Sequence, residues 1–397
     1  MINRPEYLEE LKSFKDKDLI KVVTGIRRCG KSTLFDLYID YLLKNNVQKE
    51  QIIRINLEDA DYDFLTTYKE LYEYVKTKLL PDKMNYVFLD EVQNVEKFQK
   101  ACDSLYIKNN VDLYITGSNA SLLSSELSTL LSGRYIEIKM LPLSFKEYIS
   151  YTGETDLSKK YNDYITKSSF PYALMLDKTK DIRSYLDGIY NTIIIKDIAE
   201  RKKIADIGQL KSVIKFMFDN IGNLCSSTKI ANTMTSAGRN ISVPTVENYL
   251  NALVESFVLY KAERYDIKGK QLLTSGVKYY ASDIGLRYYL LGSERADEGH
   301  ILENIVYLEL LRRGYEVYVG KSEEDKEVDF IAKNEYGTEY YQVSYTVRDE
   351  KTLERELSSL DKINDHNPKY LLTMDMTPYT SHNGIKQINV LDWLLEK

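Results

Sequence analysis

The chain has 397 residues, which is too long for one ordinary core and predicts two or three domains. Its composition is that of a globular protein, and no apolar run is long enough to cross a bilayer. A net charge of −6 argues against a strongly basic nucleic-acid binder, three scattered cysteines exclude a disulfide framework, and the N-terminus lacks a signal-peptide pattern. We therefore expect a cytoplasmic protein with no membrane partner.

The first part of the chain alternates between apolar strands and amphipathic helices. Strands are expected over residues 19–24, 51–57, 86–90, 112–116 and 135–141. Helices are expected over residues 32–45, 68–80 and 96–108. Alternation of this kind predicts a parallel sheet covered by helices.

The pattern turns helical from about residue 151 to 220, and a different arrangement follows. We expect a helix from Thr228, a turn at Gly238 and a second helix from about Pro244 to Ser256, because proline suits a first helical turn. The alternating segment 258–280 then predicts a hairpin. Helix, turn, helix and hairpin is the order of a winged helix.

The last hundred residues predict a compact α/β domain. Helices are expected over residues 301–313 and 350–363. Strands are expected over residues 316–319, 327–332, 340–345 and 369–374.

Gly25 to Ser32 read GIRRCGKS, which fits the phosphate-loop pattern G-x-x-x-x-G-K-[ST] between a strand and a helix. Glycines let the backbone fold around phosphate, so that amide hydrogens and the helix N-terminus face the anion. Lys31 would reach the β- and γ-phosphates, Ser32 would ligate Mg²⁺ and Thr33 would contact the α-phosphate. The expected nucleotide-binding residues of this segment are Gly25, Ile26, Arg27, Arg28, Cys29, Gly30, Lys31, Ser32 and Thr33.

The strand YVFLD ends in two carboxylates, at the spacing from the phosphate loop that an ATPase needs. Asp90 would support Mg²⁺, and Glu91 would act as the general base that polarises the attacking water. The next strand ends in TGSN, where Ser118 or Asn119 would sense the γ-phosphate; a loop cap is the alternative. The cofactors expected are therefore ATP and Mg²⁺.

A catalytic arginine has several candidates. Arg134, in LSGRY, is the first choice for neutralising γ-phosphate charge, acting in its own chain or on a neighbouring one. Arg27 and Arg28 are alternatives, and a solvated surface salt bridge is the ordinary role of any one arginine. Gln93, just after the carboxylates, is a further polar candidate.

These motifs resemble a known family. GIRRCGKS, VFLDEVQ, ITGSN and LSGRYIEIKMLPLSFKEY look like the prokaryotic AAA-superfamily ATP-binding proteins that carry a C-terminal domain of unknown function. KSSFPYAL, IIIKDIAERKKI, YYASDIGLR, ILENIVYLELLRRGYEVYVG and EVDFIA agree, so the resemblance runs from near residue 4 to the C-terminus. A strand between the phosphate-loop strand and YVFLD also fits the additional-strand P-loop class of RecA-like and AAA-type ATPases.

In that family the final domain resembles the PD-(D/E)xK restriction-endonuclease core, in which carboxylates hold a divalent cation beside a lysine. Glu303 matches the acid on the first helix, and Asp329 matches the aspartate. Where E-x-K should stand, the strand reads Gln342-Val343-Ser344, so both a carboxylate and the lysine are missing. We expect a degenerate site without nuclease activity, unless Lys321 or Lys333 takes the lysine's role.

The expected fold is an α/β P-loop ATPase followed by smaller domains. The boundaries are 1–150 for the AAA-type domain, 151–205 for a helical lid region, 206–290 for a winged-helix-like domain and 291–397 for the nuclease-like α/β domain.

Three functions remain open from the sequence. The first is an ATPase whose nucleotide state controls a half that binds double-stranded DNA. The segment from Lys261 to Arg287 supports it with six basic and three acidic residues. The cations expected to contact phosphate are Arg239, Lys268, Lys270 and Lys278. The second is a nucleotide-dependent switch that acts on a protein partner or by self-association, and the third is an ATP-assisted nuclease.

Overall fold

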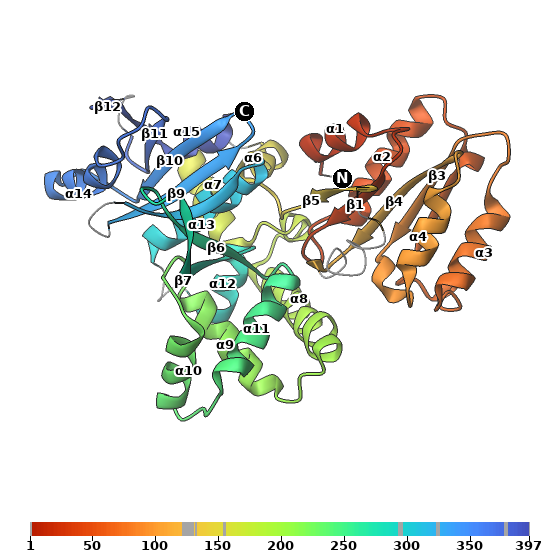
Figure 1. Cartoon of the computed structure of the whole chain (residues 1–397), viewed down its shortest axis with the longest axis horizontal. Helices are drawn as coiled ribbons and strands as arrows, with labels where there is room; N and C mark the ends of the chain where they lie inside the picture. Colours follow the sequence, from red (N-terminus) through yellow and green to blue (C-terminus); the bar gives the residue numbers. More distant parts are fainter. Residues whose placement is uncertain are drawn as a thin grey trace. The chain divides into compact units, whose positions relative to one another are not determined.

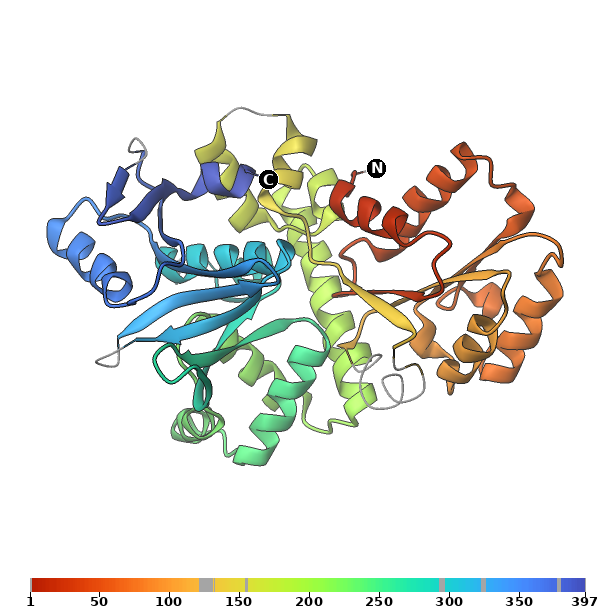
Figure 2. The same ribbon diagram turned by 45° about the horizontal axis from the view of Figure 1, so that its top comes forward.

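The computed structural model describes residues 2–120, 131, 133–153, 156–292, 297–322, 326–376 and 380–396. The chain divides into two compact units, each of which we describe by itself (Figures 1 and 2). Unit 1 comprises Met1–Pro142 with Glu255–Phe257, and unit 2 comprises Leu143–Val254 with Val258–Lys397. Among the described residues, no helix is long and apolar enough to cross a membrane.

Unit 1 contains one parallel five-stranded sheet in the order β2-β3-β4-β1-β5. Its strands are β1 (Ile20–Thr24), β2 (Ile52–Asn56), β3 (Asn85–Asp90), β4 (Val111–Gly117) and β5 (Tyr135–Lys139). In the chain β2 comes between β1 and β3, whereas in the sheet β4 separates them. The predicted α/β class with a parallel sheet and an additional strand is confirmed.

Helices cover both faces of this sheet, with α1 and α2 on one side and α3 and α4 on the other (Figure 1). The helices are α1 (Pro5–Ser13), α2 (Lys31–Lys44), α3 (Tyr68–Lys78) and α4 (Phe98–Tyr106), with 3₁₀ turns η1 (Lys49–Gln51), η2 (Ala60–Tyr62) and η3 (Val92–Asn94). Successive side chains along a strand point to opposite faces of the sheet, so each strand contributes to the core on both sides. Leu89 and Ile115 join the core under α3 and α4, whereas Phe88 and Tyr114 stack at 4.7 Å and meet Phe35 of α2.

Unit 2 begins with a helical region that runs from α6 to α11. The helices of the whole unit are α6 (Phe145–Thr152), α7 (Leu157–Lys167), η5 (Pro171–Met175), α8 (Thr179–Thr192), the π-helix η6 (Ile193–Glu200), α9 (Ile207–Asp219), α10 (Ser227–Ser236), α11 (Val243–Glu255), α12 (Ile284–Leu291), α13 (Glu298–Arg312), α14 (Glu350–Asp361) and α15 (Val390–Leu395). Gly238 has a φ of +80° between α10 and α11, so the predicted turn lies where glycine is favoured.

The strands of unit 2 form one sheet of eight in the order β12-β13-β11-β10-β9-β8-β6-β7. They are β6 (Leu259–Asp266), β7 (Gln271–Ala281), β8 (Glu316–Lys321), β9 (Glu327–Asn334), β10 (Gly337–Ser344), β11 (Lys369–Thr373), β12 (Thr380–His382) and β13 (Ile385–Asn389). Helix, turn, helix and hairpin follow in the expected order, but β6 pairs with β8, so the hairpin belongs to the larger sheet. The winged-helix assignment stays a prediction.

Two helices cover opposite faces of this sheet. On one face, Tyr307 of α13 stacks on Tyr280 of β7 with ring centroids 4.1 Å apart, beside Phe330. On the other face, Leu360 of α14 packs in a core with Ile331. The successive residues 330 and 331 thus point to opposite sides, which is the period of a strand buried on both faces.

Candidate functional site

The phosphate loop joins β1 to α2 at the carboxyl edge of the parallel sheet, where ligands bind in folds of this kind. Gly25 has a φ of +151°, and a Cβ there would lie 2.1 Å from the carbonyl oxygen of Met140. Gly30 has a φ of +108° and precedes the first residue of α2. Only glycine fits at residue 25, so the backbone is held in a tight cradle at a helix N-terminus.

Lys31 reaches back over this cradle. Its Nζ donates to the carbonyl oxygens of Gly25 (3.0 Å) and Ile26 (3.3 Å) and lies 3.4 Å from Oε1 of Glu91. The side chain is 3% exposed. Burial alone would lower the pKa of Lys31, but the negative charge of Glu91 outweighs it and raises the pKa, so the amine stays charged.

The two carboxylates at the end of β3 are held by the neighbouring strand. The Thr116 hydroxyl of β4 donates to Asp90 Oδ1 and accepts from the backbone N–H of Glu91 at 2.9 Å. Glu91 has a φ of +53°, which turns the chain sharply after the strand. Thr116 was not among the sequence candidates, although its place at the end of a parallel strand was a signal for it.

Glu91 lies in a polar network. Gln93 Nε2 donates to Glu91 Oε2 at 2.5 Å and to Ser118 Oγ at 3.4 Å. Burial would raise the pKa of Glu91, but the charge of Lys31 and these polar neighbours lower it, so the carboxylate is ionised and able to accept a proton. The structure thus brings together Lys31, Glu91, Gln93 and Ser118, and it buries Asn119 on the same strand end.

Arg54 of β2 also enters the site, and sequence reasoning missed it. Its NH2 group lies 3.4 Å from Asp90 Oδ2, 3.2 Å from Asp36 Oδ1 and 3.3 Å from the carbonyl oxygen of Ser32. The signal was a single cation inside the apolar strand IIRIN. Arg54 therefore supplies positive charge beside the carboxylate expected to support Mg²⁺.

The phosphate loop is fixed from behind by a second arginine that the sequence did not point to. Arg4 is 2% exposed and donates to the carbonyl oxygens of Cys29 (3.0 Å) and Leu141 (2.7 Å). Its guanidinium also lies over the ring of Tyr7. Cys29 itself is buried inside the loop, and this burial raises the pKa of its thiol.

The remaining loop residues differ in exposure. Arg27 pairs with Glu58 at 2.6 Å and adds to the positive charge that lowers the pKa of Glu91. Arg28 and Ser32 are exposed, and Thr33 is half-buried in the first turn of α2. Ser32 thus stands open beside the cradle.

Arg134 lies at the opposite edge of the sheet. Its carbonyl oxygen accepts from Ile20 at the start of β1, whereas the phosphate loop follows the end of that strand, about 13 Å away at the rise of an extended chain. Its guanidinium pairs with Asp103 at 2.6 Å and lies over the ring of Tyr106. This geometry argues against an action on the phosphate of its own chain and leaves two alternatives, an ordinary surface salt bridge and an action on a neighbouring chain.

Unit 2 contains a buried charge cluster at the nuclease-like residues. Lys278 of β7, with a side chain 4% exposed, lies 2.8 Å from Glu303 and 2.6 Å from Glu327. Tyr280 donates to the same Glu303 oxygen at 2.6 Å. Lys278 was expected to contact nucleic-acid phosphate, and that expectation is wrong because the amine is enclosed by carboxylates.

Asp329 and Gln342 complete this cluster. The Asp329 carboxylate accepts from the backbone N–H of Val343 at 2.8 Å. The Gln342 side chain accepts from the backbone N–H of Asp329 at 3.3 Å and donates to Glu356 at 2.8 Å. Burial raises the pKa of Asp329 well above its usual range, and the charge of Glu303 adds to the shift while Lys278 opposes it.

A divalent cation does not fit this cluster. Within the described ranges, no three or more His, Cys, Asp or Glu side chains are arranged to hold a metal ion. The ammonium of Lys278 stands among the carboxylates that a cation would need. Lys333, the lysine considered as a substitute, instead lies 3.4 Å from the ring centroid of Tyr265.

The fold and the loop define an AAA-type P-loop domain, a nucleotide-binding class. Residues 17–149 match the family described as AAA domain, and residues 158–297 match a domain of unknown function, DUF8612. The Walker-type ATPase paby2304 of Pyrococcus abyssi is similar in fold, with a TM-score of 0.51 and 14% identity over 73% of this chain and 96% of that one.

Two sequence relatives cover most of the chain. An uncharacterized protein of Haemophilus influenzae is 41% identical over 100% of this chain and 99% of its own length. The uncharacterized protein MJ1544 of Methanocaldococcus jannaschii is 31% identical over 89% of this chain and 80% of its own. The chain therefore belongs to the family of these proteins.

Proposed function

We propose that this protein binds ATP with Mg²⁺ at the phosphate loop and hydrolyses it. The observation that carries the proposal is the buried Lys31, which lies 3.4 Å from Glu91 above a backbone cradle that only glycine permits at residue 25. A charged amine and an ionised carboxylate thus flank the place where the terminal phosphates would lie. The AAA-type fold supports the same reading.

The residues present fit both expected ligands. The loop from Gly25 to Gly30 supplies backbone N–H groups at a helix N-terminus for phosphate, and Lys31 supplies charge. The exposed Ser32 hydroxyl and the Asp90 carboxylate would hold Mg²⁺. When bound, Mg²⁺ would neutralise charge on the phosphate oxygens.

Each residue then has one task. Glu91 is ionised and would accept the proton of the attacking water. Gln93, which donates to Glu91 and to Ser118, orients that carboxylate and links it to the next strand. On binding, Lys31 would exchange the carbonyl and carboxylate oxygens that it now contacts for phosphate oxygens.

We further propose that the nucleotide state controls a half of the chain that binds double-stranded DNA. The division into a domain of residues 1–150, a lid region of 151–205, a winged-helix-like domain of 206–290 and a nuclease-like domain of 291–397 belongs to this proposal. Support comes from the helix–turn–helix–hairpin order and from exposed cations at Arg239, Lys268 and Lys270. Nuclease activity is not part of the proposal because Lys278 fills the cluster at Glu303.

A second candidate is a nucleotide-dependent switch that acts on a protein. One observation favours it: α11, the helix that would read DNA in a winged helix, has the sequence VPTVENYLNALVE and carries no lysine or arginine. Its exposed side chains include Glu247, Asn248 and Asn251. A net charge of −6 points the same way.

Phosphate release from ATP and Mg²⁺, with and without double-stranded DNA, tests both candidates. We expect Glu91→Gln to bind ATP with unchanged affinity and to turn it over about 100-fold more slowly, because the base is lost while the cradle remains. Glu96→Gln is the matched control, since it makes the same change on an exposed residue nearby. Normal turnover in Glu91→Gln would remove Glu91 from its role.

The DNA arm separates the two candidates. A severalfold rise in turnover with DNA supports coupling to a nucleic acid, and the rise should vanish in the Lys31→Ala variant. A rate that is real but unchanged by DNA contradicts the coupling and favours the protein switch. No release above the Glu91→Gln blank would contradict the ATPase itself.

A further inference from the structure

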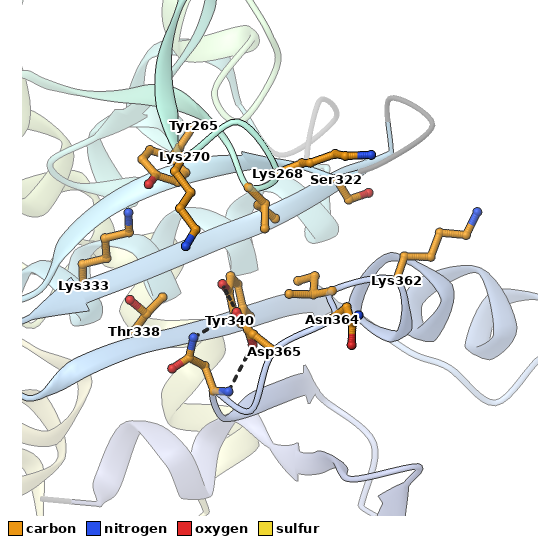
Figure 3. A pocket seen from close by; sticks show the side chains of 13 residues that line it. Tyr265, Lys268, Lys270, Ser322, Lys333, Thr338, Tyr340, Lys362, Asn364 and Asp365 are labelled. Atoms are coloured by element: carbon orange, nitrogen blue, oxygen red, sulfur yellow. Dashed lines mark hydrogen bonds between the residues drawn. The ribbon is translucent and has the colours of Figure 1, made fainter.

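A lysine-lined pocket lies in unit 2, on the side of the sheet that α14 covers (Figure 3). The sequence suggested Lys268 and Lys270 as phosphate contacts, but it did not reveal the cavity that joins them to Lys333 and Lys362. Four segments meet there: the end of β6 with the turn to β7, the residue after β8, the surface of β9 and β10, and the loop after α14. Its volume is about 510 Å³. Its lining residues are Tyr265, Ile267, Lys268, Lys270, Ser322, Lys333, Thr338, Tyr340, Lys362, Ile363, Asn364, Asp365 and Asn367.

The pocket carries an excess of positive charge. Four of its lining residues are lysines, and Asp365 is its one lining carboxylate. Asp365 is occupied with the loop, since it accepts from the Tyr340 hydroxyl at 2.6 Å and from Asn367 at 2.9 and 3.0 Å. Lysines gathered around one cavity repel one another, so an anion that enters it relieves that repulsion.

Two of the lysines bring charge to the cavity that no described carboxylate pairs with. Lys333 is held over the ring of Tyr265 at 3.4 Å, and neither it nor Lys270 forms an ion pair within the part of the chain that the structure describes. In Figure 3 both amines lie on the same side of the cavity. The Thr338 hydroxyl and the amide of Asn364 line the same space and add neutral hydrogen-bond donors. The lining therefore suits phosphate oxygens.

The arrangement favours an extended anion over a compact one. Lys268, at the tip of the hairpin, and Lys362, at the end of α14, extend away from the cavity centre in Figure 3. Positive charge thus continues beyond the pocket rather than closing around one group. The ring of Tyr265 is covered by Lys333 and the hydroxyl of Tyr340 is bonded to Asp365, so neither ring is offered to a base.

We propose that this pocket is where the chain binds the phosphate backbone of a nucleic acid. The proposal rests on the DNA-coupled function above and locates its contact at the sheet instead of at α11. Lysines serve as point charges for phosphate, and backbone contacts of this kind bind without reading sequence. The hairpin supplies two of the four cations, so the surface of the sheet takes the role expected of a recognition helix.

The test removes the same amount of charge from two places. One variant combines Lys270→Gln with Lys362→Gln at the pocket, and the matched control combines Lys211→Gln with Lys215→Gln, which are exposed on α9. Binding of a labelled DNA duplex, and of a single strand of equal length, is measured by fluorescence anisotropy over a range of salt concentrations. Thermal unfolding checks that each variant is folded.

We expect the pocket variant to weaken binding about tenfold or more and to reduce the salt dependence of log K by about two, while the control stays near the wild type. Wild-type binding in the pocket variant, or an equal loss of binding in the control, would overturn the proposal. Binding of inorganic tripolyphosphate at the pocket without binding of either DNA would overturn it in favour of a small phosphorylated ligand. No binding of any probe would overturn it too.

The ATPase assay keeps this outcome separate from the proposed function. If ATP turnover responds to DNA and the pocket variant still binds DNA normally, only the location is wrong. If ATP is hydrolysed but DNA neither binds nor changes the rate, the coupling and the pocket fail together while the ATPase stands. Lys333→Gln removes a third positive charge from the pocket. Its DNA affinity is measured at temperatures below its own unfolding midpoint, so that a loss of binding is not a loss of folding.

Discussion

The two units each bury a lysine against carboxylates, and the two lysines are held in different ways. Lys31 contacts Glu91 at 3.4 Å and otherwise donates to backbone carbonyl oxygens of a loop at the sheet edge. Lys278 lies 2.8 and 2.6 Å from two carboxylates. The loose contacts of Lys31 leave it able to exchange partners for phosphate, whereas those of Lys278 are already satisfied. A buried lysine is thus evidence for a ligand only when its partners can be replaced.

The first test of this comparison is Lys31→Ala. We expect ATP turnover to fall about 1,000-fold, since preorganised charge on a transferring phosphoryl group is worth that much. The unfolding midpoint should fall less than in Lys278→Met, because Lys31 lies 3.4 Å from one carboxylate whereas Lys278 lies within 2.8 Å of two. Lys44→Ala, at the exposed end of the same helix, is the control. Turnover that survives in Lys31→Ala would show that this lysine does not act on phosphate.

Lys278→Met should give the reverse result. We expect a loss of about 3–5 kcal/mol in the free energy of unfolding of unit 2, because Glu303 would be left buried without its cation. ATP turnover of the folded protein should stay near that of the wild type. The measurement is chemical denaturation alongside phosphate release.

Lys261→Met on the neighbouring strand is the control for Lys278→Met, since Lys261 is 41% exposed and pairs with Glu263 at the surface. Its removal should cost less than about 1 kcal/mol. Equal losses in the two variants would mean that the enclosure of Lys278 does not matter, and the contrast with Lys31 would fail.

Asp329→Asn sharpens the account of the unit 2 cluster. The pKa of Asp329 is raised in the folded chain, so the folded state binds its proton more tightly than the unfolded state. As the pH rises above about 3.8, the unfolded chain ionises first, and wild-type stability declines until the folded pKa is passed. Asparagine does not titrate, so the free energy of unfolding of the variant should rise relative to that of the wild type by up to about 1.4 kcal/mol per pH unit over this range.

The measurement for Asp329→Asn is the difference in unfolding free energy across pH 4 to 8, with Asp361→Asn, exposed at the end of α14, as the control. A difference that does not change with pH would mean that Asp329 is ionised in the folded chain. The result would also bear on the nuclease-like reading, since an ionised pair of Asp329 and Glu303 is what a metal would require.

The sequence predicted most of the fold, because the elements that carry it have strong periodicity. The strands of unit 1 and the helices α10, α11 and α13 begin and end within a few residues of the expected bounds. What it could not predict depends on pairing between distant segments. The hairpin β6–β7 was read as a separate wing, but its pairing with β8 is set by tertiary contacts that no local pattern reveals.

The candidate sites show the same limit. The phosphate loop, Asp90 and Glu91 were found because their spacing is local and chemically specific. Lys278 was misread and Arg54 was missed, because each reaches its partners from an element distant in the sequence. A lysine in a charged segment resembles a surface cation in the sequence, and only the packing of α13 on β7 places it beside Glu303.

Arg134 provides the smallest expected effect. It is 44% exposed and pairs with Asp103 at the edge of the sheet away from the phosphate loop, so Arg134→Ala should change the free energy of unfolding by about 0.5 kcal/mol or less. At low protein concentration we expect ATP turnover to equal that of the wild type. Turnover should be measured as protein concentration rises, because an arginine that acts on a neighbouring chain matters only when chains associate. A tenfold loss at the lowest concentration would show action within one chain and contradict the placement of Arg134 at the far edge.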